Sequence, residues 1–191
     1  MMDRKQVWKC MGWGAKAALL SSLLLTGGCS SWFEKDKPQP ACPKVSILAD
    51  ANHLIRFRPG AGHDLTDVLV EAEFGHFDGS CQYDWKTMKM NVQLQVSLDA
   101  RIGPAAGSER KAELAYFVAI PAYYPKPEAK IVASIPLTFP KNTDVVRYQD
   151  EQVELNLPIP EVKDMAKYEI FLGIQMTEDE LDFARAHKQG N

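Results

Sequence analysis

The sequence predicts an all-β protein built as an antiparallel two-sheet β-sandwich. Two observations predict it: apolar and polar residues alternate with period two through much of the chain beyond Val45, and turn residues interrupt the alternation at short intervals. Alternation places the apolar side chains on one face of a strand. About seven to nine such strands, with almost no helix between them, suit a sandwich of immunoglobulin-like kind, and a small closed barrel is the alternative.

The segment 88–98 carries the clearest strand pattern. Its apolar residues are Met88, Met90, Val92, Leu94, Val96 and Leu98, and they alternate with Lys89, Asn91, Gln93, Gln95 and Ser97. We therefore expect one buried face and one solvated face. Similar alternation predicts strands at 68–74, 81–85, 131–139, 153–159 and 168–176. The segment 114–120 is apolar on both parities, which is typical of a central strand.

Turn residues separate these strands. Turns are predicted at 58–62, 78–80, 102–104, 124–127 and 140–142, where Gly, Pro and Asn concentrate. Pro136, Pro158 and Pro160 lack the backbone N–H that the interior of a sheet needs. We expect them on edge strands or at strand ends.

One short helix is predicted at the C-terminus, from about residue 178. Thr177 and Glu180 have the spacing of a capping box, and Met176 and Leu181 are placed to form a hydrophobic staple around it. The apolar stripe of this helix is thin. It is expected to be either a surface cap or a docking element.

The first 28 residues have the composition of a secretion signal. Four basic residues precede the apolar run 17–25, which is about half the ~20 residues that a membrane-spanning helix needs. The following residues, Leu25-Thr26-Gly27-Gly28-Cys29, resemble the lipobox of bacterial lipoproteins, with Thr26 where the usual pattern has Leu. The resemblance implies cleavage before Cys29 and transfer of a diacylglyceryl group to its thiol. An ordinary secreted protein cleaved near Gly28 is the alternative.

The resemblance to lipoproteins also implies an address. Acyl chains on Cys29 would anchor the mature protein to a membrane of the cell envelope, because each buried methylene contributes about 0.8 kcal/mol. Position two of the mature chain is Ser30 rather than Asp. By the pattern of the family, this favours the outer membrane with the protein facing the periplasm. Residues 29–41 are then a linker in which Trp32 and Phe33 rest at the membrane interface or, alternatively, dock a partner.

Cysteine usage predicts one disulfide. Cys10 leaves with the signal and Cys29 is consumed by lipid, so Cys42 and Cys81 remain as an even pair in an oxidising compartment. A free thiol pair or a metal site is the alternative, but neither cysteine has the close Cys or His spacing of a zinc site. The domain that follows, 42–191, is long enough to bury a core of its own.

Charge limits the class of partner. Residues 1–28 hold 4 of the 22 basic residues and 1 of the 25 acidic ones, so the mature chain has 18 basic against 24 acidic residues and a net charge of −6. An acidic domain argues against nucleic acid as the partner.

No constellation of residues predicts an enzyme, a cofactor or a metal centre. His53, His63 and His76 lie near acids, and Met88 and Met90 form an M-x-M pair that could bind copper. The histidines fall in polar turns and the methionines in the alternating strand, so loop and core roles are the simpler interpretation. A metal or small-ligand carrier using these residues is kept as the alternative function. The motifs of serine hydrolases and zinc proteases are missing from the sequence.

The loop around Tyr123 and Tyr124 is the candidate partner-binding site. Two adjacent tyrosines stand among prolines between two predicted strands. Rigid aromatic side chains are common at binding surfaces because little entropy is lost when they are buried. The two rings could instead fold back over the end of the sandwich.

The start of the mature domain resembles a family of uncharacterised lipoproteins of alphaproteobacteria. The likeness runs through Ala41-Cys42-Pro43-Lys44-Val45 and on to Asp64-Leu65-Thr66-Asp67-Val68. It implies the same envelope address and carries over no activity or substrate. We therefore expect a membrane-anchored module that binds or assembles another envelope protein, with the Tyr123–Tyr124 loop and the terminal helix as its contact surface.

Overall fold

The computed structural model describes residues 37–60, 62–150 and 153–187. The predicted signal, Cys29, Trp32 and Phe33 lie outside these residues. The strands and the helix belong to one compact unit that begins at Pro38. No helix in the described part of the chain has the length and apolarity needed to span a bilayer.

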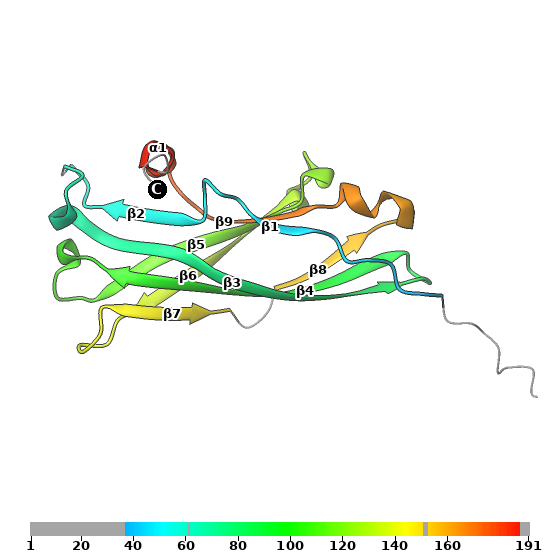
Figure 1. Ribbon diagram of the computed structural model, residues 1–191, viewed down its shortest axis with the longest axis horizontal. Coiled ribbons are helices and arrows are strands. Elements are labelled where there is room, and N and C mark those ends of the chain that lie inside the picture. Colours follow the sequence, from blue (N-terminus) through cyan, green and yellow to red (C-terminus); the bar gives the residue numbers. More distant parts are fainter. Residues whose placement is uncertain (1–36, 61, 151–152, 188–191) are drawn as a thin grey trace, which may run out of the picture. The chain divides into compact units, whose positions relative to one another are not determined.

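In the described part of the chain, nine strands form two sheets, so the predicted sandwich is confirmed (Figure 1). The first sheet has the order β1-β9-β5-β6, and its strands are β1 (Val45–Ile47), β9 (Ile170–Ile174), β5 (Lys111–Ala119) and β6 (Lys130–Thr138). The second has the order β2-β3-β4, and β7 and β8 follow one another along the far edge of β4; its strands are β2 (His53–Phe57), β3 (Val68–Asp84), β4 (Lys89–Ile102), β7 (Val145–Gln149) and β8 (Val153–Pro158). This arrangement is compatible with an immunoglobulin-like fold.

Strand direction departs from the prediction at one pair. The second sheet is antiparallel throughout, but β1 runs parallel to β9 in the first. Alternation of apolar and polar residues indicates which face of a strand is buried, but it does not indicate the direction of the neighbouring strand. The parallel pairing of β1 with β9 could therefore not be predicted from the sequence.

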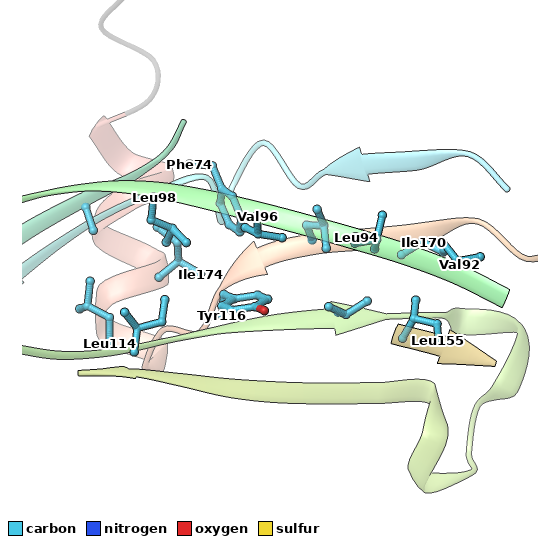
Figure 2. Close-up of a cluster of buried hydrophobic side chains, with 14 of the residues drawn as sticks. Phe74, Val92, Leu94, Val96, Leu98, Leu114, Tyr116, Leu155, Ile170 and Ile174 are labelled. Atoms are coloured by element: carbon cyan, nitrogen blue, oxygen red, sulfur yellow. The ribbon is translucent and has the colours of Figure 1, made fainter. Parts of the chain in front are cut away.

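The core lies between the two sheets, where side chains from both point toward one another (Figure 2). The even-numbered residues of β4 form one wall, and Met90, Leu94 and Val96 are fully buried there. This confirms the predicted alternation from residue 90 onward. Met88 is the exception: it has a positive φ of 55°, lies in the turn before β4, and is 38% exposed.

One hydrogen bond links the two sheets through a buried tyrosine of the core. The buried Tyr116 of β5 donates from its hydroxyl to the carboxylate of Asp150, just beyond the end of β7. Burial, together with this hydrogen bond and the charge of Asp150, raises the pKa of Tyr116 well above its usual range. The bond ties the two sheets together where β7 gives way to β8.

The predicted turn at 78–80 is wrong. These residues lie inside β3 and pair with Gln95, Leu94 and Gln93 of β4. An irregularity in the pairing does occur nearby, between Phe74 and Phe77. The residues Asp, Gly and Ser favour a turn by their local preferences, but hydrogen bonding to the long strand β4 keeps this segment extended. Among the described residues, the other predicted turns, at 58–62, 102–104, 124–127 and 140–142, fall between strands, except that Ile102 is still the last residue of β4.

The disulfide is confirmed: Cys42 and Cys81 are bonded, with their Cα atoms 5.7 Å apart. Gln39 lies close by, and its side chain accepts from the backbone N–H of Tyr83 at 2.8 Å and donates to the Tyr83 carbonyl at 3.2 Å. Together they fasten the entering chain along the part of β3 that β2 does not reach.

The terminal helix α1 (Glu178–His187) begins with the predicted capping box. The backbone N–H of Glu180 donates to Thr177 Oγ1 at 3.3 Å, and the N–H of Thr177 donates to Glu180 Oε2 at 2.8 Å. Glu180 also pairs with Arg56 of β2 at 2.6 Å, and Phe183 packs edge-on against Phe57. The helix is therefore docked on β2 through an ion pair and an aromatic contact.

We expect the docking of α1 to depend on the charge of Glu180. Burial raises the pKa of Glu180, but hydrogen bonds from Arg56 and Thr177 outweigh it and leave the pKa lowered. A lowered folded pKa contributes stability that is present above the unfolded value of about 4.3 and is lost as pH falls through the folded pKa. Glu180→Gln should therefore lower the free energy of unfolding by about 1 kcal/mol at pH 7.

The difference between wild type and Glu180→Gln should shrink as the pH falls below about 4.3. Urea unfolding at pH 7 and pH 3 measures it. Glu178→Gln is the control, because Glu178 is exposed and belongs to the same first turn. An equal loss in both variants would show that the helix dipole, rather than the Arg56 pair, explains the effect.

Candidate functional site

A groove of about 380 Å³ opens at one end of the sandwich, between the edge strands β6 and β8. Its apolar lining comes from both sheets: Ile120 and Ile131 from the first, and Leu155 and Leu157 from the second. Leu155 and Leu157 belong to the core, whereas Ile131 is 42% exposed. The groove is thus a place where the core of the sandwich reaches the surface.

Charged residues of both signs line the same groove: Lys89, Lys126, Glu128 and Glu154. An apolar floor beside mixed charges is the composition of a protein-binding site, where an apolar anchor is buried and polar groups set its orientation.

The loop 121–129 forms one wall of the groove and is rich in local hydrogen bonds. It consists of two short 3-10 turns, Pro121–Tyr123 and Pro127–Ala129, each starting at a proline. Lys126 N–H donates to the Tyr123 carbonyl at 2.8 Å, and Ile120 N–H closes the loop on the Ala129 carbonyl at 2.7 Å. The ring of proline fixes φ near the value that the first residue of such a turn adopts. The two prolines therefore restrict the conformations of the loop.

The two tyrosines of this loop have different roles. Tyr123 folds back: its ring centroid lies 5.6 Å from that of Tyr168, its hydroxyl is 3.4 Å from the Pro158 carbonyl, and burial raises its pKa to about 12. Tyr124 is 82% exposed. The fold-back alternative therefore holds for Tyr123, which lines the groove, whereas the ring of Tyr124 is exposed. Partner binding by these tyrosines stays a prediction.

The terminal helix is not part of this site. It packs on β2, while the Tyr123–Tyr124 loop follows β5 and lies well apart from it along the sandwich (Figure 1). The loop and the helix, the two parts of the expected contact surface, therefore do not form one continuous patch. Their separation follows from the length of β5, since the chain passes near α1 at Glu113 and reaches the groove at Ile120.

The structure keeps the candidate metal ligands apart. His53 pairs with Glu71 at 2.8 Å, His63 packs against Phe57 and Phe183, and Met90 is buried in the core. Within residues 37–60, 62–150 and 153–187, no three His, Cys, Asp or Glu side chains converge as a metal would need. The ordinary packing and pairing of these residues account for their positions.

A serine–histidine pair that sequence reasoning missed lies at the irregularity in β3. Ser97 Oγ is 2.9 Å from His76 Nδ1, and His76 Nε2 is 3.6 Å from Asp78. The order resembles that of a hydrolase triad, but Ser97 is only 1% exposed and also bonds both backbone groups of His76. Ser97 therefore anchors the strand irregularity. A glycine within a strand, here Gly75, is the signal that could have indicated it.

A second hollow, of about 460 Å³, lies between α1 and β2. Acids and histidines line it, among them Asp50, His53, Glu71 and His187. Three of these four groups are already in ion pairs: Asp50 with Arg185 at 3.5 Å, and His53 with Glu71 at 2.8 Å. The hollow offers solvated polar groups rather than an apolar anchor, so it is less suited to binding a protein than the groove.

Comparison with known proteins assigns no family to this chain. No family model matches it, and neither a curated protein nor a solved structure does. The function must therefore be argued from the groove and from the sequence.

Proposed function

We propose that the mature protein is a lipid-anchored binding module of the bacterial cell envelope that holds another envelope protein in the groove between β6 and β8. The observation that carries the proposal is the apolar floor of that groove, together with the exposed ring of Tyr124 on the loop that forms one of its walls. Exposed aromatic rings next to an apolar pocket are typical of the energetic centres of protein interfaces. The sequence supports the address through the lipobox-like segment that ends at Cys29.

The entry of the chain into the sandwich supports the same proposal. Gln39 lies against Tyr83, at the end of β3 that pairs with the start of β4, and Lys89 at that start lines the groove. An anchor on Cys29 would therefore join the sandwich at the end that carries the groove.

Crosslinking in cells tests the proposal. A photoreactive amino acid replaces Tyr124 in the full chain, and the matched control replaces Leu65, which is 86% exposed in the 3-10 turn just before β3. We expect irradiation to link position 124, and not position 65, to one envelope protein in the membrane fraction. Cys29→Ser should move the protein out of that fraction. Absence of any product from position 124, or the same products from both positions, would contradict the proposal.

A further inference from the structure

The outer edge of β6 carries backbone groups without a partner strand. Within residues 37–60, 62–150 and 153–187, β6 is the last strand of its sheet and pairs only with β5. Ile120 N–H donates to the Ala129 carbonyl, so residues 120 and 129 are a hydrogen-bonded pair of the antiparallel ladder. Hydrogen-bonded pairs recur at every second residue. The odd-numbered residues of β6 therefore bond to β5, and the even-numbered residues turn their backbone N–H and C=O groups away from it. The N–H of Lys130 is taken by Pro127. Among the described residues, none bonds the N–H of Val132 or of Ser134.

Beyond Ser134, the outer edge of β6 cannot donate a backbone hydrogen bond at the next outward residue. Pro136 also faces outward and has no N–H to donate, which is a common way of blocking a strand edge. The open part is therefore the five-residue stretch 130–134. It is also the part of β6 in which apolar side chains are exposed, with Ile131 at 42% and Val132 at 51%.

The open stretch adjoins the groove. Ile131 has the parity of the buried Ile135 and Leu137, so its side chain points toward the opposite sheet and lines the groove. A strand added along 130–134 would continue the first sheet. Its inward side chains would enter the space between β6 and the leucines of β8.

The facing edge of β8 is less available. Tyr123 reaches over it, with its hydroxyl 3.4 Å from the Pro158 carbonyl, and Pro158 itself has no N–H. The Asn156 side chain is engaged with Asn91 at 3.1 Å. The edge of β8 also has outward N–H groups, at Glu154 and Asn156, but β6 is the edge whose open stretch carries exposed apolar side chains, Ile131 and Val132.

From these observations we infer that the partner binds as an extended strand, pairing with β6 over Lys130–Ser134 and inserting an apolar side chain into the groove. The inference rests on the proposed function and names the chemistry of the partner. An extended segment with apolar residues at alternate positions satisfies the donors of Val132 and Ser134, and it covers the apolar lining from both sheets. Backbone pairing would supply affinity, and the groove would select the side chain.

Two substitutions at one position test the inference in the full chain with the photoreactive group at position 124. Val132→Pro removes an outward N–H while leaving the bonds to β5, and Val132→Thr is the matched control that keeps the N–H. We expect Val132→Pro to lower the yield of the partner crosslink roughly tenfold, and Val132→Thr to leave it within about twofold. Ser134→Pro, which removes the other donor, should act in the same way. Retention of the chain in the membrane fraction and its urea unfolding midpoint verify that each variant is folded.

The outcomes separate this inference from the proposed function. A partner crosslink that survives in both proline variants would overturn strand addition while leaving the groove as the binding site. No partner crosslink in the parent chain would overturn both. A product of twice the mass of the chain would show that a second copy occupies the edge, and a link to residues 30–36 would show that the linker does. Either result would overturn the inference of a separate partner.

Discussion

Removing the disulfide is expected to lower the free energy of unfolding by about 4 kcal/mol, for a loop that spans 39 residues between Cys42 and Cys81. A loss of this size is a large fraction of the roughly 5–15 kcal/mol that stabilises an ordinary domain. The physical reason is twofold. The bridge restricts the unfolded chain, and in the folded protein it holds the entering segment against the part of β3 that β2 leaves uncovered.

Urea unfolding of the double variant Cys42→Ser/Cys81→Ser measures this effect. Cys42 is exposed, so a reducing agent should reach the bridge and lower the stability of the wild type by the same amount. The double variant supplies the control, because reductant should leave its stability unchanged. A double variant as stable as the wild type would show that the bridge does not stabilise the entry of the chain.

Gly103→Ala is expected to cost about 3 kcal/mol or more, because a new side chain there would meet backbone. A Cβ at this position would lie 2.1 Å from the Val68 carbonyl oxygen, and Gly103 N–H donates to the Leu69 carbonyl at 2.9 Å. The start of β3 and the end of β4 would have to separate, with loss of that bond. No side-chain rotation can relieve the contact.

Gly62→Ala is the matched control for Gly103→Ala. A Cβ at Gly62 would meet only the side chains of Asp67 at 3.6 Å and Asp64 at 3.9 Å, which is ordinary contact. Its stability should stay within about 0.5 kcal/mol of the wild type. Equal unfolding midpoints for the two alanine variants would refute the close approach of β3 and β4 at Gly103.

Features that depend on nearby residues were predicted well from the sequence. The capping box of α1 joins Thr177 and Glu180, three residues apart, and the buried face of β4 follows from its own alternation. Features set by distant segments were not. The turn expected at 78–80 became strand because β4 pairs along it, and the parallel contact of β1 with β9 joins the two ends of the domain.

The candidate site was predicted only in part for the same reason. Tyr123 and Tyr124 identified the loop, but adjacent residues give no indication of which ring will fold back. The groove floor combines Ile131 of β6 with Leu155 and Leu157 of β8, which come from different sheets. Their meeting depends on how the two sheets stack. The free edge of β6 was hinted at by Pro136, which the sequence placed on an edge strand or at a strand end.

We propose that this sandwich is a lipid-anchored module with Cys29 at its mature N-terminus. Intact-mass analysis of the protein recovered from native membranes tests it most directly. If the proposal holds, the recovered chain begins at Cys29 and carries a diacylglyceryl group and its fatty acids. An unacylated chain, or one that begins at another residue, would contradict the claim and leave the groove without its membrane address.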